Sequence, residues 1–196
     1  MTLKVLDQSE IERLNQYFDQ IPLLEDHPYL WVRNRLIAFF MLDAGLRAGE
    51  VVQLTFDSVF CGLTMNDSIS LSASTTKSKR ARIIPMTTRL GTFLHIYVNR
   101  PSPPLTITPF DYLFPSGNPH RHLTTRQVHR ICTEIGQSAF GRPFNPHQLR
   151  HTFATRLMRV SPIRVVQELL GHGSLSSTQI YTHPNTNDLK NAIELM

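Results

Sequence analysis

Apolar residues near the start of the chain recur at helical spacing. Ile11, Leu14 and Phe18 would lie on one side of a helix, and Ser9-Glu10-Ile11-Glu12 fits a capping box that opens it. The spacing therefore predicts a first helix that begins at Ser9 and buries one face.

A longer and more uniformly apolar segment follows. A second helix is expected over residues 28–44, because Pro28 suits a first helical turn and Gly45 suits a left-handed stop. Residues 36–42 are apolar on nearly every side of such a helix, so it should be central and buried. A third helix is expected over residues 48–54.

After Asp57 the pattern changes from helical to alternating. Residues 68–72 and 82–84 are typical of strands, joined by a basic turn that carries Lys77 at its tip. A Pro-rich connection is expected at residues 101–109, and further helices at residues 90–98, 124–138, 146–158, 162–170 and 174–181. The chain is therefore predicted to form one α+β domain over residues 1–196, mostly helical, with one small antiparallel sheet.

The composition is that of an ordinary globular protein, with 41% hydrophobic and 18% charged residues. The apolar run at residues 36–42 is too short to cross a bilayer, and no signal peptide is evident at Met1. Cys61 and Cys132 do not make a disulfide framework. A reduced, cytosolic protein is expected.

The net charge of +5 is unevenly distributed along the chain. Residues 1–67 contain five Lys/Arg and ten Asp/Glu, whereas residues 68–196 contain fifteen Lys/Arg and five Asp/Glu. Concentrated positive charge favours a polyphosphate partner such as nucleic acid. A solvated basic surface is the alternative.

The first candidate motif is Gly45-Leu46-Arg47-Ala48-Gly49-Glu50, directly after the predicted buried helix. Arg47 could clamp a phosphate, because the paired donors of a guanidinium match phosphate oxygens. Glu50 would then have a structural role, since a carboxylate that faced DNA would be repelled. An ordinary local ion pair between Arg47 and Glu50 is the alternative.

The second candidate is the basic turn between the two predicted strands. From Lys77 to Arg89 there are five basic residues and no acidic one. A lysine brought to a phosphate in this way could also protonate a departing oxygen. A solvated hairpin is the alternative.

The third candidate lies on the predicted helix at residues 146–158. His147, Arg150 and His151 fall on one face at positions i, i+3 and i+4, while the stripe of Leu149, Phe153 and Leu157 should pack. Two histidines at this spacing also suit zinc. However, residue 148 is a glutamine where a metalloprotease motif has glutamate, and Arg150 would repel a cation. The face suits an anion better, so no metal is expected.

The fourth candidate runs from Leu169 to Tyr181. Gly171 would end one helix, His172 would lie in the turn, and Ser174 would cap the next helix, which carries Tyr181 near its end. Tyr181 could instead be a half-buried aromatic residue. The helix–turn–helix outline also allows a DNA-binding regulator without catalytic activity.

The order of these motifs along the chain closely resembles that of the tyrosine recombinase (phage integrase) family. The resemblance covers residues 3–190, the catalytic domain of that family. It rests on the arginine motif with Gly49 where serine is more usual, the return strand Arg82-Ile83-Ile84-Pro85, His147-Gln148-Leu149-Arg150 followed by His151-Thr152-Phe153-Ala154-Thr155, Leu170-Gly171-His172, and Ile180-Tyr181-Thr182-His183.

The resemblance implies six catalytic residues in a reaction that needs neither metal nor cofactor: Arg47, Lys77, His147, Arg150, His172 and Tyr181. Tyr181 would attack the DNA phosphate and form a 3′-phosphotyrosyl bond. The two arginines and His172 would stabilise the phosphate charge. Lys77 would protonate the leaving 5′-oxygen, His147 would help to take the tyrosine proton, and Glu50 and His151 would have supporting roles.

The resemblance also implies the partners. Double-stranded DNA is the expected substrate, and the family acts as a homotetramer on two duplexes, so a free chain could be a monomer. Residues 184–196 are the candidate for a C-terminal segment exchanged between subunits, although they could equally fold back on their own subunit. Candidate DNA-binding residues are Lys79, Arg80, Arg82, Arg121, Arg126 and Arg130.

Most family members have a separate N-terminal helical domain that clamps the DNA, and Met1 lies almost directly at the catalytic domain. The chain is therefore expected to be an excised domain or a short enzyme similar to the fimbrial phase-switching invertases, from a bacterial, phage or mobile-element source. A DNA-binding regulator of the same fold and a type IB topoisomerase-like relaxing enzyme are the alternative functions.

Overall fold

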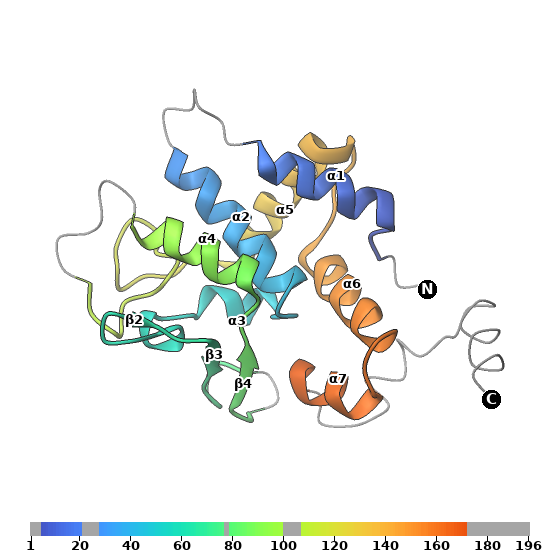
Figure 1. Ribbon diagram of the computed structural model, residues 1–196. Helices are drawn as coiled ribbons and strands as arrows, with labels where there is room; N and C mark the ends of the chain where they lie inside the picture. The colour runs from blue at the N-terminus through green and yellow to red at the C-terminus, as the bar shows by residue number, and fades with distance from the viewer. Residues whose placement is uncertain (1–4, 21–27, 77–78, 100–106, 172–196) are drawn as a thin grey trace.

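The computed structural model describes residues 5–20, 28–76, 79–99 and 107–171. Its helices are α1 (Gln8–Asp19), α2 (Pro28–Leu42), α3 (Ala48–Val52), the 3₁₀ turn η1 (Phe56–Ser58), α4 (Thr88–Val98), α5 (Thr125–Phe140), α6 (Pro146–Met158) and α7 (Ile163–Leu170). The strands are β1 (Phe60–Cys61), β2 (Thr64–Met65), β3 (Ser68–Leu71) and β4 (Arg82–Pro85). The arrangement is the predicted α+β one, dominated by helices (Figure 1).

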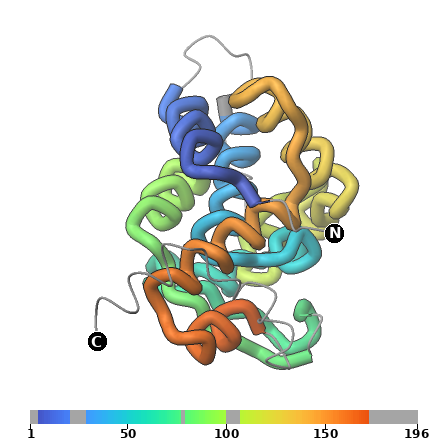
Figure 2. The backbone as a smooth tube through the Cα atoms, turned by 90° about the vertical axis from the view of Figure 1, so that its right-hand side faces the viewer, coloured from blue at the N-terminus to red at the C-terminus, as the bar shows by residue number. Residues whose placement is uncertain are grey.

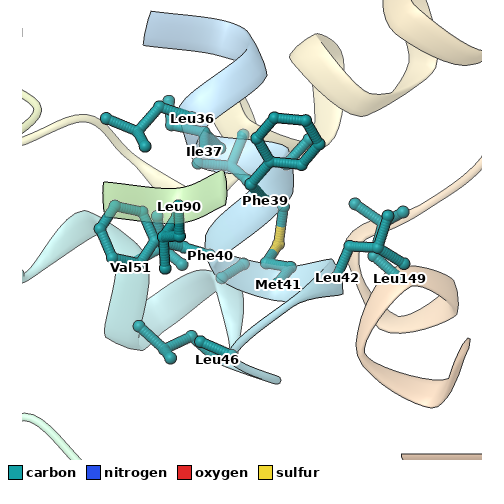
Figure 3. Close-up of a cluster of buried hydrophobic side chains, with 14 of the residues drawn as sticks. Leu36, Ile37, Phe39, Phe40, Met41, Leu42, Leu46, Val51, Leu90 and Leu149 are labelled. Atoms are coloured by element: carbon teal, nitrogen blue, oxygen red, sulfur yellow. The ribbon is translucent and has the colours of Figure 1, made fainter. Parts of the chain in front are cut away.

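Helix α2 forms the centre of the core. Every side chain from Leu36 to Leu42 is at most 1% exposed, which confirms the burial predicted from its uniformly apolar sequence. The helix packs against α4 on one side and α6 on another, and Leu90 and Leu149 reach it from those helices (Figure 3). Gly45 follows with a φ of 65°, the predicted left-handed conformation.

The start of α1 differs from the prediction. Asp7, rather than Ser9, caps the helix by accepting a hydrogen bond from the backbone N–H of Glu10, and the Glu10 carboxylate accepts one in return from the backbone N–H of Asp7. Both Asp and Ser are good N-cap residues. The capping box begins two residues earlier than predicted because Glu10 is the acidic partner.

The described residues form two small antiparallel sheets, whereas one was predicted. Strands β3 and β4 pair as predicted, with Ile69 opposite Ile84. Strands β1 and β2 form a second pair, with Phe60 opposite Met65. Strands of two residues are too short to show a period of two, so the sequence pattern did not reveal them.

Helices α6 and α7 complete the domain on the side of α2 opposite β1 and β2 (Figures 1 and 2). Asn145 caps α6 by accepting from the N–H of Gln148, and Pro146 occupies the first turn. Leu149 is buried in the main core. Phe153 and Leu157 pack with α7 in a smaller cluster, as the predicted stripe required.

Two expected features lie outside the described residues: the helix at residues 174–181 and most of the Pro-rich connection. In the part of the chain that is described, no helix is long and apolar enough to span a membrane.

Candidate catalytic site

Arg47 and Glu50 come together where α3 begins. The Glu50 carboxylate accepts a hydrogen bond from the backbone N–H of Arg47 (2.8 Å) and another from Arg47 Nη1 (3.1 Å). A carboxylate in the first turn satisfies a helical N–H group and interacts favourably with the helix dipole. The local ion pair that the sequence allowed is therefore present, and it holds the backbone from which Arg47 projects.

Glu50 is also contacted by two arginines from distant segments. Its side chain is 2% exposed, and it accepts hydrogen bonds from Arg82 Nη1 (3.0 Å) and Nη2 (2.8 Å). Arg150 Nη1 lies 3.8 Å from Glu50 Oε2. One buried carboxylate therefore lies among three guanidinium groups.

Burial by itself raises the pKa of Glu50. The hydrogen bonds and positive charge of Arg82, with the backbone N–H of Arg47 and the charge of Arg150, outweigh that effect and leave the pKa below its ordinary value. The carboxylate is ionised at neutral pH and balances part of the positive charge gathered here.

Arg150 is held by backbone carbonyls as well as by Glu50. It is 4% exposed, its Nη1 donates to the carbonyl of Gly45, and its Nη2 donates to the carbonyl of Leu170 (2.8 Å). These acceptors lie at the end of the glycine turn after α2 and at the end of α7. The guanidinium is thus fixed in place by three elements of the fold.

His147 and His151 lie one turn apart on α6, with ring centroids 6.3 Å apart. His147 is exposed and His151 is half-buried. Burial, and then the nearby His147 and Arg150, lower the pKa of His151 below its ordinary value. His151 is therefore kept neutral beside the arginine.

A pocket of about 520 Å³ lies between α3, α5, α6 and the segment that leads to Lys77. Its lining includes Arg47, Glu50, Thr76, Thr125, His129 and His147. Thr125 and His129 were not among the predicted site residues. Their i, i+4 spacing on α5 was the available signal, but nothing in the sequence showed that this face turns toward Arg47.

Three of the six predicted catalytic residues are described: Arg47, His147 and Arg150. Lys77, His172 and Tyr181 lie outside the described residues. Of the predicted DNA-binding residues, Lys79, Arg80, Arg121, Arg126 and Arg130 are exposed. Arg82 is buried, and its pairing with Glu50 does not agree with the expected contact to the DNA backbone.

The expectation that no metal is bound rests on the donor chemistry of the site. The helix face that carries His147 and His151 also carries Arg150, and a guanidinium repels a cation. Among the described residues, His, Cys, Asp and Glu side chains form no group of three that could hold a metal ion. The site combines three guanidinium groups and two imidazoles with the Glu50 carboxylate, and this excess of positive charge suits an anion.

The sequence profile of the phage integrase family matches residues 4–188. The chain belongs to the phage integrase family. Among curated relatives, it is 35% identical over 173 residues to tyrosine recombinase XerA of Pyrococcus furiosus, covering 88% of this chain and 57% of that protein. It is 37% identical over 160 residues to tyrosine recombinase XerD of Lacticaseibacillus casei, covering 79% of this chain and 51% of the relative. The chain thus spans just over half the length of these phage integrase family proteins.

Solved structures of recombinases share the fold of this phage integrase family member. The crystal structure of XerA recombinase superposes with a TM-score of 0.75 at 28% identity, covering all of this chain and 65% of that one. XerH recombinase bound to its palindromic difH substrate also has a TM-score of 0.75, at 24% identity, with 54% of that chain covered. The predicted tyrosine recombinase catalytic-domain fold is confirmed.

Proposed function

We propose that this chain is the catalytic domain of a site-specific DNA recombinase that cleaves and rejoins DNA through a 3′-phosphotyrosyl intermediate. The observation that carries the proposal is that Arg47 and Arg150 both meet the Glu50 carboxylate. They come from motifs far apart in the sequence, yet both contact Glu50, and Arg47 and His147 line the same pocket. Two arginines that meet at one carboxylate, one of them lining the pocket, are suited to a phosphodiester.

The proposed reaction begins when the Tyr181 oxygen attacks the scissile phosphorus and its proton passes to His147. The bond from phosphorus to the 5′-oxygen breaks, and that oxygen receives a proton from Lys77 and leaves as a 5′-hydroxyl. Arg47, Arg150 and His172 stabilise the added negative charge on the non-bridging oxygens. A 5′-hydroxyl from another strand can then attack the phosphotyrosine, which reverses the chemistry and exchanges strands.

The electrostatics of the described residues support this arrangement. The negative charge of Glu50 offsets the repulsion between Arg47, Arg82 and Arg150, so the cations can be gathered before DNA arrives. Because the carbonyls of Gly45 and Leu170 orient Arg150, little reorganisation is needed when charge develops on the phosphate. The chemistry uses neither metal nor nucleotide cofactor.

Double-stranded DNA is the proposed substrate. The XerH structure contains difH DNA, and structures of the Tn1549 transposon integrase contain circular intermediate DNA. Arg126 and Arg130 are exposed on α5, and we propose that they contact the backbone of such a duplex. We further propose that the active species is a homotetramer on two duplexes, with residues 184–196 exchanged between subunits, in the cytoplasm of its host cell.

The direct test is covalent trapping. A DNA site is first selected from a library of random duplexes by binding to the Tyr181→Phe variant, and a nick is then placed beside the scissile phosphate. The wild-type protein should form an adduct that survives denaturing electrophoresis, whereas Tyr181→Phe should bind the duplex and form none. An adduct that persists in Tyr181→Phe would refute the assignment of the nucleophile.

Two other functions would give different results. A DNA-binding regulator of the same fold would bind the selected duplex and form no adduct with either protein. A type IB topoisomerase-like enzyme would relax supercoiled plasmids that lack the selected site, whereas the proposed recombinase would act only on plasmids that contain it.

A further inference from the structure

Arg82 occupies an unusual position in the small sheet. Side chains of β4 alternate between the two faces, and the pattern places Arg82 and Ile84 inside and Ile83 outside. Ile83 is 68% exposed, whereas the Arg82 side chain is 4% exposed. A charged residue therefore takes an inward position while its apolar neighbour faces solvent, which is the reverse of what stability alone favours.

The hydrogen bonds of Arg82 lead to the candidate catalytic site. Its two Nη groups donate to the two oxygens of Glu50, and its Nε donates to the carbonyl of Leu169 (3.1 Å). Glu50 is the same carboxylate that contacts Arg47 and Arg150. Only a guanidinium can make this forked pair and a third, sideways hydrogen bond at once.

The end of α7 is built on two of these arginines. The carbonyl of Leu169 accepts from Arg82, and the next carbonyl, of Leu170, accepts from Arg150. Cations at the last carbonyls of a helix satisfy acceptors that have no partner within the helix and interact favourably with its dipole. Arg82 and Arg150 therefore share two partners, the Glu50 carboxylate and the C-terminal end of α7.

Gly171 provides the space for this contact. It has a φ of 62°, and a Cβ atom there would lie 2.8 Å from Arg82 Nη1. The turn that directly precedes His172 in the sequence thus packs on the Arg82 guanidinium. Strand β4 itself is the segment that follows the basic turn with Lys77, and it lies beside α7 (Figure 1).

We infer that Arg82 is a positioning residue of the recombinase site, an inference that rests on the function proposed above. Through Glu50 it orients Arg47 and Arg150 toward the phosphate. Through Leu169 and Gly171 it fixes the position of the end of α7, directly before His172 in the sequence. A buried ion pair is costly to desolvate and is often no more stable than an apolar pair. We therefore attribute the Arg82–Glu50 pair to the geometry of the site rather than to the stability of the fold.

The test compares Arg82→Lys and Arg82→Gln with the control Arg142→Lys. Arg142 also makes a long-range arginine–carboxylate pair, with Glu10 (Nε to Oε1, 2.7 Å), but that pair joins the α5–α6 connection to α1. Cleavage of the nicked duplex is measured at saturating DNA, below the melting temperature of each variant. Arg82→Lys keeps the charge and should still fold and bind DNA, yet it should cleave about 10²-fold more slowly than wild type. Arg142→Lys should cleave at the wild-type rate.

A second substrate separates positioning from a loss of stability. A methylphosphonate at the scissile position is uncharged, so it depends less on the two arginines that clamp the phosphate. With this substrate the deficit of both Arg82 variants should shrink to less than about tenfold. An equal deficit on both substrates, or cleavage by Arg82→Lys at the rate of Arg142→Lys, would overturn the inference while the wild-type adduct still supported the recombinase function. If the wild type formed no adduct, the proposed function would fail and this inference with it.

Discussion

Arg150 Nη1 lies 3.8 Å from Glu50 Oε2, so the arginine of the His-x-x-Arg motif meets the glutamate of the first arginine motif inside the protein. Glu50 in turn accepts a hydrogen bond from Arg47, which places both proposed phosphate-binding arginines on one carboxylate. This relationship brings two motifs that are far apart in the sequence close together, as the proposed action at one phosphate requires.

Replacement of Arg150 by lysine should abolish most of the cleavage activity. Lysine carries the charge but cannot donate to the carbonyls of Gly45 and Leu170 in the fixed geometry of a guanidinium. The rate of adduct formation should fall by about 10²–10³-fold with little change in DNA affinity. Arg156→Lys, an exposed change on the same helix, should leave the rate unchanged. A rate for Arg150→Lys within about tenfold of wild type would contradict the phosphate role.

Loss of the Glu50 charge should destabilise the fold. In Glu50→Gln the buried guanidinium of Arg82 has no counter-charge in its forked pair, and such a change costs about 3–5 kcal/mol of unfolding free energy. Urea denaturation measures this loss of unfolding free energy. The matched control is Glu134→Gln, which breaks an exposed pair with Arg130 and should cost less than about 1 kcal/mol. Equal losses in the two variants would show that Glu50 is not held as described.

Acid should remove the contribution of the Glu50 carboxylate to the unfolding free energy. Its pKa in the folded protein lies below the ordinary 4.5, because hydrogen bonds and charge from Arg82 outweigh the opposing effect of burial. The stabilisation is therefore complete above the unfolded pKa and is lost as the pH falls through the folded one. Between about pH 5 and pH 3 the unfolding free energy of wild type should fall more steeply than that of Glu50→Gln. Parallel curves would contradict the lowered pKa.

His151 should titrate below its ordinary pKa of 6.5, since burial, His147 and Arg150 all disfavour its protonated form. The folded state then loses stability as the pH falls below 6.5, because the unfolded chain binds the proton more readily. NMR titration of the His151 ring gives the midpoint directly. His147→Asn should raise that midpoint, whereas Arg159→Gln, at the far end of the same helix, should leave it unchanged. No response to His147→Asn would contradict the coupling between the two rings.

Gly171→Ala should disturb the proposed catalytic site, whereas Gly141→Ala should not. Both Gly171 and Gly141 have positive φ, which costs an alanine about 1–2 kcal/mol, but only the added Cβ at Gly171 meets Arg82. Gly171→Ala should therefore lose more unfolding free energy than Gly141→Ala and should also cleave DNA more slowly. Thermal melts and adduct formation measure the two effects. Similar behaviour of both variants would show that the turn does not depend on Arg82.

The helices could largely be predicted because their signals are local. Helix α6 begins at Pro146 and ends at Met158, as its apolar stripe and its proline required, and α2 is buried as its uniform sequence required. The cap of α1 was misplaced by two residues because Asp7 and Ser9 are both suitable N-cap residues. Strands β1 and β2 were missed because two residues cannot display a period.

The sequence by itself determined which chemistry is available: the order of the arginine, lysine, histidine and tyrosine motifs, and the face of α6 that carries His147 and Arg150. Only the tertiary structure decided where the Arg82 side chain lies. From the sequence it was the first residue of a predicted strand and one of several basic residues expected to contact DNA, whereas the fold turns it inward onto Glu50 and the end of α7. A buried ion pair between distant residues depends on how strands and helices pack, and no local pattern of hydrophobicity or charge contains that information.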